Sequence, residues 1–191
     1  MIEINDYILN PIRLNKKKKL DWYDLWIYKS DYISNYYNYI RGKYKIVDES
    51  FNYYIVLLEY GIWLLKDYSN YYDYVYVQHD IIINGMSYVK EDIKERDFAE
   101  YLKYLFYNNY DFKCICELIK KNSNKFNYYL VGVRLLFPSY YLFYFERFIL
   151  DGANYNELYV VINRTSDYEE YLKKIINLFN KYLIKKIVLP F

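Results

Sequence analysis

The sequence predicts a mainly α-helical domain of the α+β class, with a small β-hairpin near the middle of the chain. Apolar residues recur at spacings of three and four over several long stretches, which is typical of helices that bury one face. Short runs rich in aromatic and β-branched residues occur between residues 74 and 89, as expected of strands. Asn84 and Gly85 indicate a hairpin turn there. Together these patterns predict roughly seven or eight helices around one core.

Two predicted helices precede the hairpin. The first begins after Asp21, a residue type that favours the N-cap position, and ends before Gly42. The second begins near Asp48 or Ser50 and ends near Tyr68. Because this second helix is apolar almost all round, we expect it at the centre of the core.

The hairpin and the helices after it follow from the same patterns. Strands are expected over residues 74–78 and 81–83, and again at residues 88–89 after the turn. The last helix has a clear start signal, because Ser166 and Glu169 have the spacing of a capping box. The helices predicted after the hairpin cover residues 94–106, 111–121, 124–137, 139–151, 155–162 and 166–183.

Composition predicts one globular domain. Apolar residues make up 54% of the chain and charged residues 26%, which is enough to bury a core and excludes a disordered chain. We expect an irregular N-terminal segment over residues 1–19, followed by a single domain over residues 20–191. Within that segment, Lys16–Lys19 form either a solvated connector or a phosphate-binding patch. The formal net charge of +2 argues against a general nucleic-acid-binding protein.

We expect a cytoplasmic protein with no membrane-spanning segment. No stretch approaches the roughly 18 consecutive apolar residues of a membrane helix. The first ten residues mix acidic and apolar side chains, unlike a secretory leader. Cys114 and Cys116 are two positions apart in a predicted helix, so they point to different faces and are expected to be reduced thiols.

Asp80, Asn84 and Asp92 are the strongest candidates for chemistry. Phosphoryl transfer needs a carboxylate that orients the hydroxyl nucleophile, and an Asn and a second Asp that hold Mg²⁺ against the nucleotide phosphates. These residues have those types in that order. Structural loop residues are the alternative, because Asp and Asn are frequent in this chain. His79, the single histidine, is either one half of a base–orienter pair or a structural hydrogen-bonding residue.

Three segments carry a resemblance to a known family: FNYYIVLLEYGIWLL (Phe51–Leu65), KERDFAEYLKYLF (Lys94–Phe106) and RLLFPSYY (Arg134–Tyr141). Their order and spacing resemble the aminoglycoside-phosphotransferase and choline-kinase-like superfamily, and within it the spore-coat (CotS-type) kinase-like proteins of Firmicutes. The resemblance begins at about Leu20 and continues to the C-terminus. It implies the C-terminal lobe of a protein-kinase-like fold, with the N-lobe absent.

The resemblance also implies roles for residues in and after the hairpin. A catalytic residue, two Mg²⁺ ligands and three structural residues are expected, namely Asp80; Asn84 and Asp92; and His79, Arg96 and Asp97. The brace loop of the family has the form His-x-Asp, with an Asn five residues after that Asp. Here His79 and Asp80 are adjacent and Asn84 is four residues after Asp80. A shift of one residue moves a general base away from hydrogen-bonding reach of its substrate.

These departures predict a kinase-like protein that has lost catalysis and acts as a binding or structural component, in the cytoplasm or the spore coat. The five glycines provide no Gly-rich phosphate loop, so no cofactor is expected; ATP and Mg²⁺ are expected only if activity survives. A protein partner or a second copy of the chain is expected on the face left by the missing lobe.

Two alternatives remain open at this point. The first is a small-molecule phosphotransferase that uses ATP and Mg²⁺ and is completed by a separate N-lobe chain. The second is a nucleic-acid-binding module that uses Lys16–Lys19 and exposed aromatic side chains.

Overall fold

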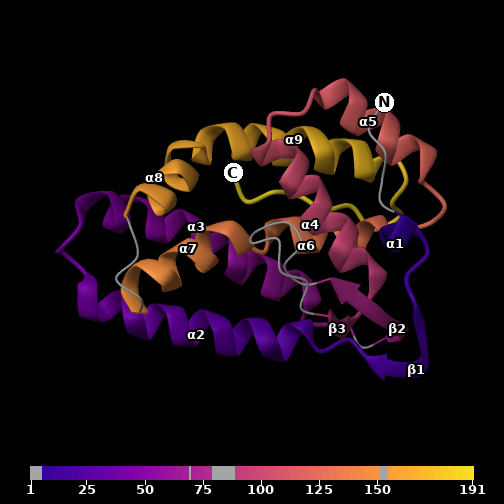
Figure 1. Ribbon diagram of the computed structural model, residues 1–191, viewed down its shortest axis with the longest axis horizontal. Coiled ribbons are helices and arrows are strands. Elements are labelled where there is room, and N and C mark those ends of the chain that lie inside the picture. The colour runs from indigo at the N-terminus through magenta and orange to yellow at the C-terminus, as the bar shows by residue number, and fades with distance from the viewer. Residues whose placement is uncertain (1–5, 69, 79–88, 151–154) are drawn as a thin grey trace. The chain divides into compact units, whose positions relative to one another are not determined.

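The structure is a computed structural model that describes residues 6–68, 70–78, 89–150 and 155–191. It is mainly helical with a small antiparallel sheet, which confirms the predicted fold class at that level (Figure 1). The elements in chain order are α1 (Asp6–Leu9), β1 (Arg13–Lys19), α2 (Trp22–Ile40), α3 (Lys45–Leu65), β2 (Tyr71–Gln78), β3 (Val89–Asp92), α4 (Lys94–Tyr107), α5 (Phe112–Lys121), α6 (Tyr128–Leu136), α7 (Ser139–Leu150), α8 (Tyr155–Asn163) and α9 (Thr165–Asn180).

Two compact units make up the chain. The sheet unit comprises Met1–Leu20, Ser69–Leu135 and Glu170–Phe191, and it contains β1, β2, β3 and α4. The helical unit comprises Asp21–Tyr68 and Leu136–Glu169, and it contains α2, α3, α7 and α8. The candidate site residues that the structure describes all lie in the sheet unit.

Among the described residues, the sheet has three antiparallel strands in the order β1-β2-β3, where the sequence predicted a hairpin (Figure 1). The additional strand, β1, is formed by residues 13–19, which were expected to be irregular. Four consecutive lysines lack the period-two alternation of a half-buried strand, and β1 is held by backbone pairing with β2. The register shifts between Arg13 and Lys17, and Asn15 accommodates the shift with a φ of 49°, a left-handed conformation that Asn tolerates.

Helix α4 packs against β2 and supplies buried side chains to the core of the sheet unit. Phe98, Leu102 and Leu105 are fully buried. The ring of Phe98 stacks on that of Phe126, with 4.1 Å between the ring centroids. Tyr171 of α9 donates its hydroxyl to the Leu102 carbonyl at 2.7 Å. These contacts fix α4, and therefore the polar side chains that it also carries.

The helical unit has an aromatic core, in which α2 and α3 run side by side (Figure 1). Tyr37 stacks on Phe51 and Tyr54 stacks on Tyr141, and the ring centroids are 3.9 Å apart in both pairs. The Tyr54 hydroxyl lies 2.9 Å from the Thr165 hydroxyl, so a buried polar group has a partner. Tyr37, Tyr54 and Tyr141 are therefore packing residues in this unit.

Two predicted helix starts differ from those in the structure. Helix α3 begins at Lys45, ahead of the predicted cap at Asp48. The Asp48 carboxylate instead accepts hydrogen bonds from the Tyr37 hydroxyl at 2.8 Å and the Gly42 backbone N–H at 3.0 Å. Helix α9 begins before Ser166, so this serine lies within the first turn and is not the N-cap.

Candidate functional site at the start of helix α4

Only some of the predicted site residues lie in the part of the chain that the structure describes. His79, Asp80 and Asn84 lie outside the described residues, so the predicted base, one predicted Mg²⁺ ligand and the histidine stay predictions. Asp92 is the last residue of β3. Arg96 and Asp97 lie in the first turns of α4, and both are buried.

The structure brings Asp92 and Arg96 together across the junction of β3 and α4. One Asp92 carboxylate oxygen accepts the backbone N–H of Ile93 at 2.8 Å. The other lies 3.5 Å from the Arg96 Nε, and the two side chains are only 13% and 5% exposed. An ion pair at the i,i+4 spacing and a local backbone hydrogen bond therefore satisfy the carboxylate within its own chain.

This arrangement does not fit a Mg²⁺ site within the described residues. Mg²⁺ is usually bound by one or two carboxylates together with water and phosphate oxygens. Here the described donor is one carboxylate beside a guanidinium, whose positive charge opposes a second cation. Among the described residues, no group of three or more His, Cys, Asp or Glu side chains could hold a metal ion.

Asp97 lies where α4 approaches α1. Burial raises the pKa of the Tyr7 hydroxyl, and the nearby Asp97 carboxylate raises it further. The Tyr7 hydroxyl donates to the Tyr76 carbonyl at 2.8 Å, which connects α1 to β2. Asp97 also places a carboxylate in the first turn of α4, where its negative charge interacts favourably with the positive end of the helix dipole.

A second set of charges, not predicted from the sequence, is buried between α4 and α6. We call it the α4–α6 charge cluster, and it consists of Arg96, Glu100, Lys103 and Arg134. One Glu100 carboxylate oxygen accepts hydrogen bonds from Arg134 Nε at 2.9 Å and from Lys103 Nζ at 3.1 Å. All four residues are buried. Glu100 is thus shared by two cations in a site of low dielectric, where charged hydrogen bonds are strong.

Lys103 is the most enclosed member of the cluster, with 1% of its surface exposed. Burial lowers the pKa of its ammonium group to about 7; Glu100 opposes this shift, and Arg134 and Arg96 reinforce it. A lysine with such a pKa is a candidate for acid–base or nucleophilic chemistry. However, its side chain is enclosed and therefore cannot meet a substrate, so we assign it a structural role.

The sequence offered one signal for this cluster. Glu100 and Lys103 lie three residues apart within the part of α4 after Asp97, whose other positions are apolar or aromatic. Charges on a helix are usually assigned to its solvent face, and Arg134, 34 residues away from Glu100, could not be recognised as their partner from spacing. The buried placement arises because α6 covers this side of α4, which only the tertiary fold decides.

Three lysines of the run are paired with acidic residues of β2 and β3. Glu91 on β3 lies 2.7 Å from Lys18 Nζ and 3.8 Å from Lys16 Nζ. Asp73 on β2 lies 3.9 Å from Lys17 Nζ. The two lysines hold the pKa of Glu91 below its usual value. These pairs reduce the positive potential that a phosphate-binding patch would need, and lysines also discourage further pairing at a strand edge.

No helix among the described residues is long and apolar enough to span a membrane. Comparisons of the chain with protein-family models, with curated proteins and with solved structures found no match. The function is therefore inferred from the residues of the chain and from the resemblance of its three segments.

Proposed function

We propose that the chain is a kinase-like C-lobe without phosphoryl-transfer activity, which acts as a binding or structural protein, in a spore-associated setting as the resemblance implies. The positions of the three resembling segments support this. Phe51–Leu65 lies within α3, Lys94–Phe106 lies within α4, and Arg134–Tyr141 joins α6 to α7. All three are parts of a helical frame, which is what the resemblance requires of them.

The observation that carries the loss of catalysis is the bonding of Asp92. The resemblance makes this residue a Mg²⁺ ligand, and such a ligand needs oxygen lone pairs directed at the metal. In this chain the Asp92 carboxylate is bound to the Ile93 N–H and to Arg96. Replacing these contacts with a metal would leave the buried Arg96 guanidinium without that counter-charge, which is costly.

Binding of ATP tests the proposal. Isothermal titration of the purified chain with ATP, in the presence and absence of excess Mg²⁺, is expected to show no Mg²⁺-dependent binding at micromolar concentrations. Asp92→Asn is the informative variant, because it removes the charge and keeps the size of the side chain. Asp73→Asn is the matched control, since its carboxylate is exposed on β2.

The contrary result would favour the alternative of an ATP- and Mg²⁺-dependent phosphotransferase completed by a separate N-lobe chain. Micromolar ATP binding that needs Mg²⁺, is lost in Asp92→Asn and is retained in Asp73→Asn would overturn the proposal. Binding lost equally in both variants would also contradict it, because the proposal predicts no Mg²⁺-dependent binding of ATP.

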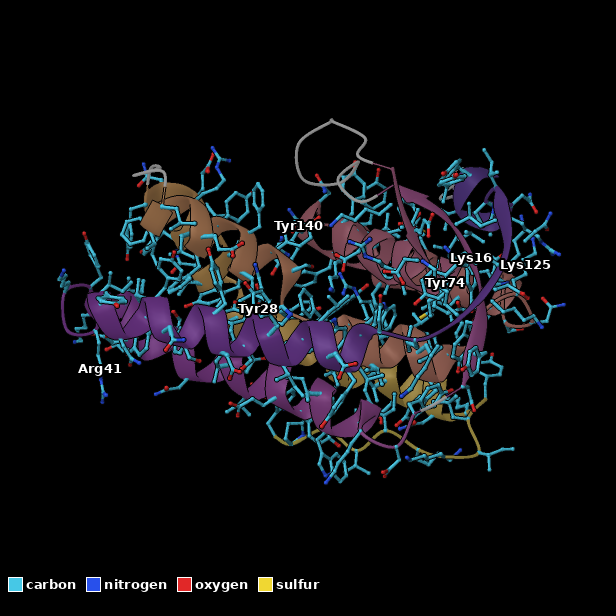
Figure 2. All side chains as sticks on the ribbon, turned by 90° about the horizontal axis from the view of Figure 1, so that it is seen from below. Lys16, Tyr28, Arg41, Tyr74, Lys125 and Tyr140 are labelled. Atoms are coloured by element: carbon cyan, nitrogen blue, oxygen red, sulfur yellow. The ribbon has the colours of Figure 1, made fainter. Side chains whose placement is uncertain are left out.

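Exposed aromatic and apolar side chains in the helical unit support a protein as the ligand, either a partner or a second copy. Tyr28 and Tyr39 on α2 are 70% and 78% exposed, and Trp63 on α3 is 63% exposed. The side chain of Tyr28 is labelled in Figure 2. Aromatic residues are enriched at protein interfaces. We expect Trp63→Ala to weaken self-association or partner capture in sedimentation and pull-down measurements, and an unchanged result for both would contradict a role of Trp63 in binding.

A further inference from the structure

A cavity of about 330 Å³ lies in the sheet unit, where α1, β1, β2 and the start of α4 meet. Its volume is at the small end of the range found for ligand pockets. None of its lining residues is one to which the kinase resemblance assigns a role. The lining residues of the cavity are Leu9, Asn10, Pro11, Arg13, Tyr72, Asp73, Val75, Lys94 and Glu95.

Two cations line this cavity without forming an ion pair in the described part of the chain. Arg13 comes from β1, is exposed and has no ion pair or side-chain hydrogen bond there. Lys94 comes from the first position of α4, and its ammonium group lies 5.4 Å from the centroid of the Phe126 ring. A guanidinium and an ammonium in one cavity attract an anion.

Each of the two acidic side chains in the cavity has an interaction partner outside the lining. Asp73 lies 3.9 Å from Lys17. Glu95 accepts the backbone N–H of Asn127 at 3.0 Å. Burial raises the pKa of the Glu95 carboxyl, while this hydrogen bond and the nearby Lys94 oppose the rise. With Asp73 paired to Lys17 outside the lining, the two cations Arg13 and Lys94 outnumber the one remaining carboxylate, that of Glu95.

The rest of the lining is apolar or aromatic. Val75 is buried and forms part of the wall through β2, and its backbone is paired with that of Arg13. Leu9 contributes from the end of α1, Pro11 from the chain between α1 and β1, and Tyr72 contributes a half-buried ring. The strand pairing thus places an apolar wall directly beside a guanidinium, a combination that suits an anion with an apolar body.

We propose that this cavity binds a small organic carboxylate, with its charge on Arg13 and Lys94 and its apolar body against Leu9, Pro11 and Val75. A carboxylate of one charge matches the lining better than a phosphate of two, because Asp73 and Glu95 also line the cavity. The site does not depend on the proposed loss of kinase activity. Its failure would leave that proposal unchanged.

The proposal is tested by titrating the full chain with phenylacetate. Binding is measured by isothermal calorimetry and by changes in ¹H–¹⁵N chemical shifts. Phenylacetate is expected to bind at least about tenfold more tightly than the neutral phenylacetamide, because charged hydrogen bonds carry the difference. Arg13→Gln and Lys94→Met, which keep most of each side chain, are each expected to weaken binding by about tenfold. Arg13→Lys should retain most of the affinity because it keeps the charge.

Arg41→Gln is the matched control, since Arg41 is exposed at the end of α2 in the other unit (Figure 2). It should leave phenylacetate binding unchanged. Equal binding of phenylacetate and phenylacetamide, or binding unaffected by both Arg13→Gln and Lys94→Met, would overturn the proposal. Tighter binding of phenyl phosphate than of phenylacetate would overturn the choice of a carboxylate, and so would a preference for inorganic phosphate. The ¹H–¹⁵N spectrum of Arg13→Gln should show a folded chain, so that weaker binding by this variant reports the lost charge and not unfolding.

Discussion

At the scale of single residues, Glu100 neutralises two buried cations in the sheet unit. Its carboxylate binds Arg134 and Lys103 at once, and neither cation has much contact with water. Taking such charges out of water is costly unless the hydrogen-bonding geometry is good. The α4–α6 charge cluster is therefore a point where one substitution should have a large effect.

Glu100→Gln is expected to lower the free energy of unfolding by about 3–5 kcal/mol, because it leaves Lys103 and Arg134 buried without their counter-charge. Urea unfolding at pH 7 measures the change. Glu117→Gln is the control, because Glu117 is exposed on α5, and it should change stability by less than about 0.5 kcal/mol. A loss of similar size in both variants would contradict a special role for Glu100.

Lys103 predicts a dependence of stability on pH. Its pKa is about 7 in the folded chain, against an ordinary lysine value of 10.5. Between these values the unfolded chain binds the additional proton. The free energy of unfolding should therefore rise with pH across this window, by at most about 1.4 kcal/mol per pH unit from this group. Below the window both states are protonated, and the cost of burying the charged lysine is fully present.

Comparison of the wild type with Lys103→Met isolates this contribution. Urea unfolding at pH 7 and pH 9 should show a rise in stability for the wild type that the variant lacks. Lys113→Met, at an exposed position of α5, should keep the rise seen in the wild type. Equal slopes in the wild type and Lys103→Met would show that Lys103 is not protonated differently in the two states.

At the scale of elements, the segment after α9 is held by a close approach to α6. A Cβ added at Gly132 would lie 2.6 Å from Ile187 Cδ1 and 3.1 Å from Ile176 Cδ1. The side chain of Asn180 binds both the backbone N–H and the carbonyl of Ile187, at 2.9 and 2.8 Å. The position of the C-terminal segment therefore depends on the absence of a side chain at Gly132.

Gly132→Ala is expected to destabilise the chain by about 1–3 kcal/mol through overpacking. Adding Ile187→Val to this variant removes the methyl group that is closest to the new Cβ and should recover part of the loss. Ile187→Val alone should cost about 1 kcal/mol, so thermal unfolding of the four proteins gives a double-mutant cycle. Additive effects of the two substitutions would contradict a direct contact.

Most helices could be predicted from the sequence because their buried faces repeat at helical spacing, as in α4 with Phe98, Leu102 and Leu105. Helix starts were less predictable, since Asp48 binds Tyr37 and Gly42 rather than capping α3. Strand β1 could not be predicted because its lysines carry no apolar pattern.

The candidate site could be predicted only in part. Residue types and their order along the chain indicated Asp92, but its pairing with Arg96 depends on the angle at which β3 enters α4. The cavity beside Arg13 depends on the pairing of a strand that was not predicted. Tertiary packing decides both features, and local patterns do not report it.

At the scale of the whole molecule, packing accounts for part of the tyrosine content. The chain has 31 tyrosines. Within the helical unit Tyr54 stacks on Tyr141, and within the sheet unit Tyr128 stacks on Phe179 with centroids 4.6 Å apart. Burial raises the pKa of the Tyr54 hydroxyl to about 12, so it stays protonated and can donate at physiological pH. Such rings contribute to the core of each unit and are not available to stack on nucleic-acid bases.

The central claim is that Asp92 serves the frame of the chain and not a metal ion. A double-mutant cycle of Asp92→Asn and Arg96→Met, measured by urea unfolding in the presence and absence of Mg²⁺, tests it most directly. We predict a coupling free energy of about 1–3 kcal/mol between the two residues, with no stabilisation of the wild type by Mg²⁺. Coupling near zero, together with stabilisation by Mg²⁺ that Asp92→Asn abolishes, would contradict it.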